Sequence, residues 1–265
     1  MHFHLPKPLH GWRQFAGEVG IIVLGVLIAL GAEQVVEAVH DRHLASLAQS
    51  DIRAELAYDA AFAAERVAIG DCVRGSIRDL HQRLVAAGDD WPGIQGRPVS
   101  GAAMAPLTGS LFAFDPPFGS PHRLWPTSAW TTATSNGVLN RADRGRFATY
   151  ATLYAMVDWL ARLQDHEIAD YSRLMPFATA QRLDPSARLQ LLSALGAVDA
   201  DNADAERLAG VFVRATAHNG IAADEGWLNR VVSGEAKFRG SCVRQGHALD
   251  AAIAHDFAGG GGLRL

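Results

Sequence analysis

The sequence contains three groups of side chains whose types could bind a metal ion or transfer protons. His40 and His43 lie on either side of Asp41, and His166 lies four residues before Asp170. The third group, near the C-terminus, consists of Cys242, His247, Asp250 and His255. A stable zinc site takes three or four ligands, whereas each of the first two groups places two residues on one helix face, and the third has none of the spacings of zinc motifs. We therefore interpret these side chains as solvated or locally paired helix faces.

Motifs of nucleophilic catalysis and of phosphate binding are missing from the sequence. We find no Gly-x-Ser-x-Gly, no Ser-x-x-Lys and no cysteine with an evident histidine partner. Residues 259–262 are all glycine, but they follow no predicted strand and open no predicted helix, as a phosphate-binding loop would. Since catalytic triads also assemble from distant residues, these absences weaken an enzymatic function without removing it. We predict no catalytic residue, cofactor or metal.

The two cysteines, Cys72 and Cys242, favour a disulfide. Neither lies in a C-x-x-C pair. In an oxidising compartment one disulfide between them would close a loop of about 170 residues and contribute roughly 5 kcal/mol in the chain-entropy model. The alternative is two separate buried thiols. We favour the disulfide because the topology below places both cysteines outside the cytoplasm, and we expect it to link the first helix of the folded domain to the last.

Helices must position the candidate residues. The first predicted helix contains an uncharged apolar run of fourteen residues, 19–32. At 1.5 Å per residue the run spans about 21 Å, less than the roughly 30 Å of a bilayer's hydrocarbon core. Flanking apolar residues therefore extend the predicted transmembrane helix and its juxtamembrane extension to 15–39. A cleavable signal peptide and a core helix of a soluble protein are the alternatives. We favour a retained anchor because the helical pattern continues through Val35, Val36 and Val39 without a proline.

The distribution of basic residues predicts the orientation of this anchor. Lys7 and Arg13 precede the apolar run, whereas Arg42 is the only Lys or Arg in the twenty residues after it. An excess of Lys and Arg keeps a flanking segment in the cytoplasm. We therefore predict a protein of the bacterial inner membrane with a cytoplasmic N-terminal segment, a periplasmic domain and a flexible tail, at 1–14, 40–258 and 259–265.

Small residues give the anchor a face on which another helix could pack. Gly25, Ala29 and Ala32 fall on successive turns, and small residues let membrane helices approach closely. Glu18 is costly against lipid, which favours a protein partner or a path to the headgroups. Besides the lipid bilayer, we expect another membrane protein or self-association at this face. The alternative is that glycine is simply frequent in membrane helices and that Glu18 reaches water.

Two segments carry a family resemblance. The first is Trp12-Arg13 followed by 17–30, Gly-Glu-Val-Gly-Ile-Ile-Val-Leu-Gly-Val-Leu-Ile-Ala-Leu, and the second contains Trp130, Gly137-Val138-Leu139, Tyr150, Leu153 and Tyr154. They resemble the N-terminal anchor and the middle segment of a group of uncharacterised bacterial proteins with one membrane helix and a helical ectodomain. The two segments cover about a fifth of the chain. The resemblance implies this topology and brings no catalytic residues.

The remaining chain predicts helices. From Trp12 to about Ala87 there is no proline and apolar residues recur at helical spacing, which predicts one very long helix or two nearly collinear ones. Thr127-Ser128 is expected to cap a short helix that ends at Asn136-Gly137. A clearly amphipathic helix should follow, over 140–175.

The last third of the chain contains helix signals of unequal strength. Asp184-Pro185 predicts a helix start, and we expect this helix to end at Gly196. A final helical region follows the polar residues 199–202 and reaches Ile253, with breaks expected at glycines 220, 226, 234 and 240. Runs of alternating apolar and polar residues are nearly absent. The predicted fold class is all-α, an elongated helical bundle continuous with the transmembrane helix.

Residues 88–127 interrupt the helical pattern with seven of the chain's eleven prolines. A connection this long inside a compact domain is usually functional or disordered. Aromatic residues within it or just after it argue against a solvated linker: Trp91, Phe112, Phe114, Phe118, Trp125 and Trp130. We expect this irregular loop to pack on one end of the bundle, with a partner or a ligand as the alternative.

Composition excludes one function class and leaves three. The chain has 24 Lys and Arg against 28 Asp and Glu, interleaved, so no concentrated basic face for nucleic acid exists. We expect a non-enzymatic interaction or accessory subunit of a membrane complex. The alternatives are a sensory domain that binds a small ligand and acts through a partner, and a membrane-tethered hydrolase with a site around His166 or His247.

Overall fold

The structure is a computed structural model that describes residues 12–94, 121–138 and 144–254. It confirms the all-α fold class. The helices are α1 (Trp12–Ala86), α2 (Ser128–Ser135), α4 (Arg144–Leu174), α5 (Pro185–His218), α6 (Glu225–Arg239) and α7 (His247–Ala254). Two short 3₁₀ turns, η2 (Met175–Phe177) and η3 (Gly240–Cys242), follow α4 and α6. One two-residue antiparallel pair joins β1 (Asp90–Trp91) to β2 (Gln181–Arg182).

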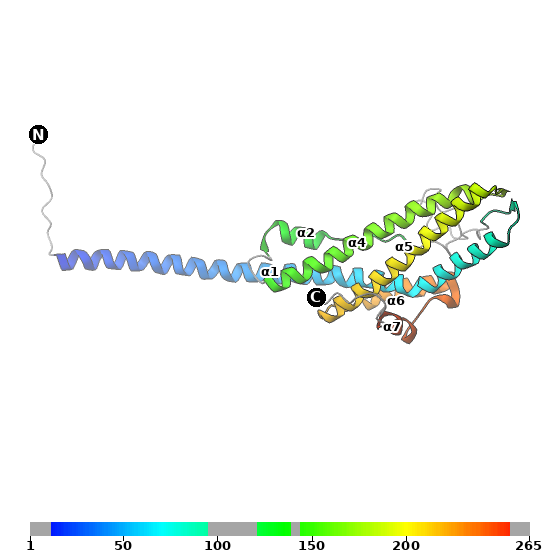
Figure 1. Cartoon of the computed structure of the whole chain (residues 1–265). Helices are drawn as coiled ribbons and strands as arrows, with labels where there is room; N and C mark the ends of the chain where they lie inside the picture. The colour runs from blue at the N-terminus through cyan, green and yellow to red at the C-terminus, as the bar shows by residue number, and fades with distance from the viewer. Residues whose placement is uncertain (1–11, 95–120, 139–143, 255–265) are drawn as a thin grey trace, which may run out of the picture.

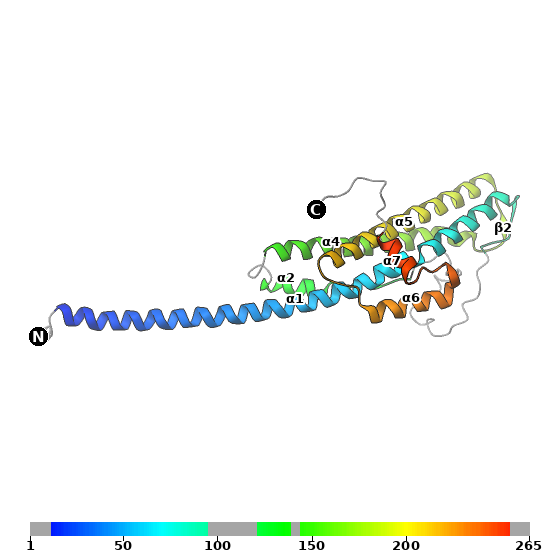
Figure 2. The same cartoon turned by 90° about the horizontal axis from the view of Figure 1, so that it is seen from below.

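The molecule is organised around α1, which runs without interruption for 75 residues. At 1.5 Å per residue its length is about 110 Å. Figures 1 and 2 show its N-terminal part projecting from the bundle as a single rod, while its C-terminal part lies inside the bundle. In the part of the chain that the structure describes, α1 is the one helix long and apolar enough to cross a membrane, and its apolar window is entirely unburied.

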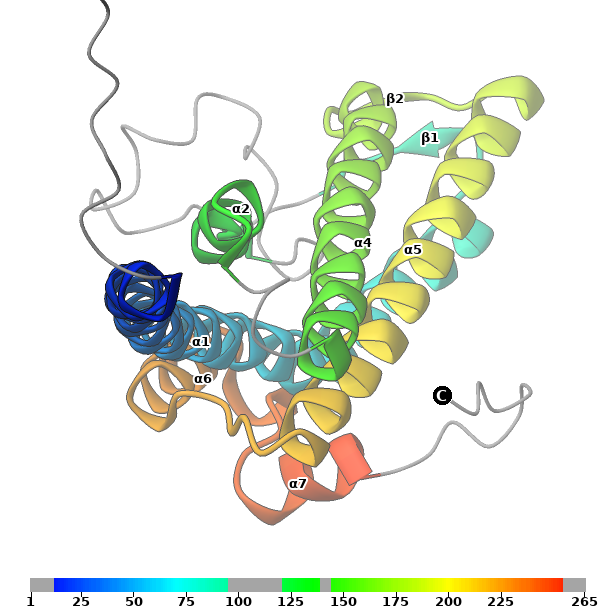
Figure 3. The same cartoon turned by 90° about the vertical axis from the view of Figure 1, so that its left-hand side faces the viewer.

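The core forms around the C-terminal half of α1. Helix α5 packs against both α1 and α4, and α6 and α7 contact α1 as well. Figure 3, a view along the bundle, shows α4 and α5 on one side of α1 and α6 and α7 on another. Four alanines of α1 between residues 60 and 64 are fully buried, so neighbouring helices approach its backbone closely.

Two helix ends are stabilised by identifiable hydrogen bonds, one from a local residue and one from a distant helix. Asp184 caps α5 as expected, because its Oδ1 accepts a hydrogen bond from the Ala187 amide at 2.8 Å. At the end of α1, Arg188 of α5 donates to the carbonyls of Leu84 (2.7 Å), Ala87 (3.0 Å) and Gly88 (2.7 Å). Carbonyls at and just after a helix C-terminus have no partner within the helix, and Arg188 supplies a donor to these three.

The helix that starts at Asp184-Pro185 was expected to end at Gly196, and this prediction is wrong. Helix α5 continues through Gly196 and through residues 199–202 to His218. The reason is tertiary packing: Val198, Asn202 and Ala205 stay on the buried face, so burial outweighs the low helix propensity of Gly, Asp and Asn.

Two of the four expected glycine breaks are also wrong. Gly220 follows the end of α5 and Gly240 ends α6, both with positive φ, but Gly226 and Gly234 lie inside α6. The α6 cap at Asp224, whose Oδ1 accepts from the Trp227 amide at 2.7 Å, starts the helix before Gly226.

Candidate functional site

The bundle buries several charged side chains, three of them in one stretch of α1. Asp59, Glu65 and Arg66 are each less than a tenth exposed, as are Glu167 on α4 and Glu206 on α5. A buried charge is destabilising unless it is paired, so each partner matters.

Arg66 joins the three longest helices. Its Nη2 forms an ion pair with Glu167 of α4 and donates to Oδ1 of Asn202 of α5 at 3.0 Å. Its Nε and Nη1 are buried without a hydrogen-bond partner. One guanidinium therefore fixes the relative position of α1, α4 and α5.

Arg123 fixes the C-terminal end of the irregular loop onto the bundle. Its Nε donates to Oε2 of Glu65 at 2.7 Å, and its guanidinium lies 5.1 Å from the centre of the Phe62 ring. Its backbone N–H and C=O form two hydrogen bonds with the Gln164 amide, at 2.8 and 2.9 Å. Burial raises the pKa of the Glu65 carboxyl, and the hydrogen bond and charge of Arg123 oppose that rise.

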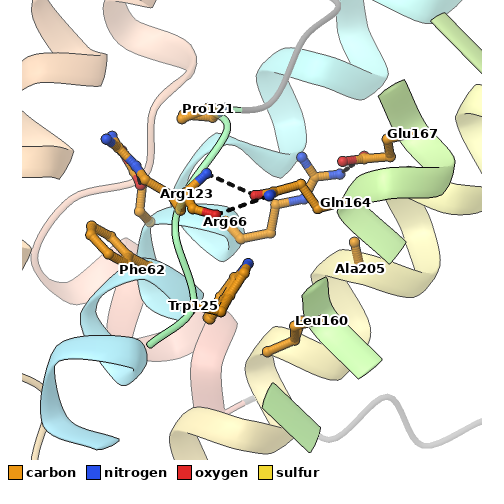
Figure 4. Close-up of a pocket in the computed structure, with 10 residues that line it drawn as sticks. Phe62, Arg66, Pro121, Arg123, Trp125, Leu160, Gln164, Glu167 and Ala205 are labelled. Atoms are coloured by element: carbon orange, nitrogen blue, oxygen red, sulfur yellow. Dashed lines mark hydrogen bonds and ion pairs between the residues drawn. The ribbon is translucent and has the colours of Figure 1, made fainter. Parts of the chain in front are cut away.

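A small cavity lies where these residues meet (Figure 4). Its volume is about 30 Å³, and Arg66, Arg123, Trp125, Gln164 and Glu167 contribute to its wall. Such a volume holds about two water molecules, whereas pockets for organic ligands measure roughly 300–1,000 Å³. A metabolite would enter only if the segment around Arg123 moved away.

A second charged cluster surrounds Glu206. Arg74 and Arg244 both pair with its carboxylate, Arg244 at 2.7 Å, and both also pair with Asp71. A Cβ on Gly70 would overlap with the Glu206 carboxylate, so only glycine leaves room for it. Burial raises the pKa of Asp71, but the hydrogen bonds from Arg244 and Arg74 outweigh this effect and hold the pKa below its usual value.

The structure contains the expected disulfide between Cys72 and Cys242 beside this cluster, with a Cα–Cα distance of 5.1 Å. Cys242 belongs to η3, between α6 and α7, so the bond links α1 to this turn and not to the last helix. Arg244 also holds the segment after η3 against α1, since its amide donates to the Ala68 carbonyl at 2.9 Å and its Nη1 to the Val67 carbonyl at 2.7 Å.

Asp59 has no hydrogen-bond partner for either carboxylate oxygen, although the residue is fully buried. Burial, and to a lesser extent the charge of Glu55, raises its pKa to about 8. Glu55 itself accepts from the Tyr154 hydroxyl at 2.6 Å and from the Ser128 hydroxyl at 2.9 Å. This pKa makes the neutral carboxylic acid the more populated form of Asp59 at pH 7.

The sequence-predicted site residues lie in separate places. Gly25, Ala29, Ala32 and Glu18 are on the projecting part of α1, where a Cβ at Gly25 would meet nothing within 4 Å. Contact of this face with a membrane partner or with a second copy stays a prediction.

The aromatic residues within or just after the irregular loop fall into two groups. Trp91 is buried and donates to the Phe177 carbonyl at 2.8 Å, Trp125 packs edge-on against Phe62, and Trp130 stacks on Tyr154. These three tryptophans contact the bundle. Phe112, Phe114 and Phe118 lie outside the described residues.

The candidate metal ligands do not form a site within the described ranges. His40, His43, His166 and His247 are exposed, and Cys242 is oxidised. His255 lies outside the described residues. No group of three or more His, Cys, Asp or Glu in described positions could hold a metal ion.

Comparison of the chain with protein-family models, with curated proteins and with solved structures gave no match.

Proposed function

We propose that this protein is a non-enzymatic accessory subunit of a complex in the bacterial inner membrane, anchored by α1 and folded in the periplasm. The continuity of α1 carries the proposal: one helix supplies both the apolar projecting segment and the centre of the bundle. A domain built on its own anchor has a fixed direction relative to the bilayer, which suits a subunit that positions other proteins.

The disulfide supports the proposed compartment. Disulfides form and persist in oxidising environments such as the periplasm, and the Cys72–Cys242 bond lies in the bundle beyond the proposed anchor. The excess of Lys and Arg before the apolar run favours the same orientation. This topology is also what the resemblance to single-pass bacterial proteins implies.

The buried polar groups support a structural role over a catalytic one. Arg66 pairs with Glu167 across two helices, Glu65 pairs with Arg123, and the cavity between these pairs measures about 30 Å³. A small-ligand sensor would need that cavity to open, so we rank this function second. A hydrolase around His166 or His247 ranks third, because both side chains are exposed and lie on different helices, α4 and α7.

Gentle detergent extraction of the native protein tests the proposal, followed by size-exclusion chromatography and intact mass with and without reductant. We expect the uncleaved, oxidised chain in a discrete complex larger than the chain itself. A lone chain cleaved near Ala32 would contradict the anchor and favour a soluble binding protein or enzyme.

A further inference from the structure

An open groove runs between the juxtamembrane part of α1 and α2, which lie side by side in Figures 1 and 2. Its volume is about 610 Å³. Its wall includes Leu44, Ala48, Ala129 and Ala133, and the acidic residues Asp41 and Asp51. The small alanine side chains leave room for another helix to approach closely, and Leu44 offers that helix an apolar contact.

The groove begins close to the proposed membrane surface. Val39 is the last residue of the apolar stretch, so Asp41 and Asp51 lie about 3 and 18 Å beyond it along the helix axis. A partner that reaches this groove is therefore confined to the same surface. A second protein in the same membrane meets this condition, because its own anchor raises its effective concentration there.

A row of acidic residues leads from the anchor into the groove. Glu33, Glu37 and Asp41 follow one another at steps of four, and Leu44, Ala48 and Asp51 continue the same face at steps of three or four. Glu33, Glu37 and Asp51 are exposed. Between Glu33 and Asp51 the chain has one Lys or Arg residue, Arg42.

The negative charge of this row determines which kind of partner the groove can bind. A second copy of the chain would bring the same acidic row against itself, and anionic lipid headgroups would also be repelled. A basic helix would be attracted at the rim by Glu33, Glu37 and Asp51, while its apolar side would pack on Leu44 and the alanines.

We propose that this groove binds a basic amphipathic helix that directly follows the membrane span of another protein. The inference rests on the proposed function, since only an anchored chain presents the groove at the membrane surface. It adds to that function the contact surface and the chemistry of the partner.

A direct test uses the full chain in nanodiscs of phosphatidylcholine and a synthetic probe peptide. The probe has an apolar Leu/Ala span followed by an amphipathic helix of Lys, Leu and Ala, and a matched peptide carries Glu in place of Lys. A photo-crosslinking residue replaces Thr132 beside the groove or, as the control, Ser46, which is exposed on the opposite side of α1. We expect adducts of the Lys peptide at Thr132 and at least fivefold fewer at Ser46 or with the Glu peptide.

Neutralising the acidic row should remove the preference. The triple variant Glu33→Gln, Glu37→Gln and Asp51→Asn should lower the yield of Lys-peptide adduct about tenfold. Neutralising the exposed acids at the far end of the bundle, Asp89→Asn and Asp90→Asn, should leave it unchanged. Equal yields from Lys and Glu peptides, or adducts with lipid or with a second copy at Thr132, would overturn the inference.

The two proposals fail in different ways. A native complex that persists while Thr132 gives no Lys-peptide adduct would leave the accessory function standing and reject this groove as its contact. A cleaved lone chain in the extraction experiment would reject both.

Discussion

Glycine at position 70 is required by a charge on another helix. The carboxylate of Glu206 occupies the space that a side chain at Gly70 would fill, and Arg74 and Arg244 hold it there. A substitution at this position must therefore displace a buried ion-paired group or shift α5 away from α1.

We expect Gly70→Ala to lower the free energy of unfolding by about 2–3 kcal/mol, the cost typical of overpacking a core. Gly75→Ala on the same helix is the matched control, since nothing lies within 4 Å of its added Cβ. It should raise stability by up to about 1 kcal/mol through helix propensity. Denaturant unfolding of the full chain in detergent measures both, and equal effects of the two substitutions would contradict the role of Glu206.

Asp59 should make stability depend on pH. Its pKa is about 8 in the folded protein against 3.8 for an aspartate exposed to water, so between these values the folded state binds more protons than the unfolded state. The contribution of Asp59 to the free energy of unfolding is therefore fully present below about pH 4 and is lost as pH rises to about 8. Asp59→Asn should remove this loss and make the variant more stable than the original at pH 9. Unfolding curves at pH 5, 7 and 9 measure it, and parallel pH profiles of the two proteins would refute it.

These ionic contacts could not be predicted from the sequence. Arg66 bonds to Glu167 and Asn202, which are 101 and 136 residues away, and Glu65 bonds to a residue 58 positions away. Helical spacing marks which face a residue occupies, but not which distant residue lies opposite. The Cys72–Cys242 bond could be predicted because the chain has two cysteines and one pairing.

At the scale of elements, α5 shows which helix boundaries the sequence predicts and which it does not. The start of α5 follows from Asp184 and Pro185, which act on their own first turn. Its end did not follow from Gly196, because a glycine on the exposed face of a packed helix costs only about 1 kcal/mol. Burial of the opposite face more than offsets that cost.

The distal end of α1 depends on Arg188. Removal of its guanidinium by Arg188→Ala would leave the carbonyls of Leu84, Ala87 and Gly88 without this donor, and we expect a loss of about 1–2 kcal/mol. Hydrogen exchange should increase over residues 84–91. Arg182→Ala is the control, because its side chain is largely exposed and its ion pairs are long, and it should have little effect. Unchanged exchange in Arg188→Ala would contradict the capping role.

At the scale of the whole molecule, the disulfide closes most of the bundle into one loop. Cys72 and Cys242 are 170 residues apart, and the segment between them includes α2, α4, α5 and α6. We expect Cys72→Ser with Cys242→Ser to lower the free energy of unfolding by about 3–5 kcal/mol. Thermal unfolding of the full chain with and without reductant provides the same comparison. An unchanged midpoint after confirmed reduction would show that the disulfide does not stabilise the fold.

The long α1 was the most predictable feature of the chain, because absence of proline and a steady apolar spacing are both visible in the sequence. What the sequence left open was one helix or two collinear ones, and the structure has one. The proposed function depends on this choice, since a hinge between anchor and bundle would free the domain from the membrane's orientation.

The distance between the anchor and the bundle tests that claim most directly. Spin labels on non-natural amino acids at Val36 and Gly75, both exposed, leave the disulfide intact. In nanodiscs, pulsed electron spin resonance should give one narrow distance distribution centred at about 58 Å, as an uninterrupted helix requires. A broad distribution, or one centred well below this value, would place a hinge between the membrane and the bundle and contradict the account.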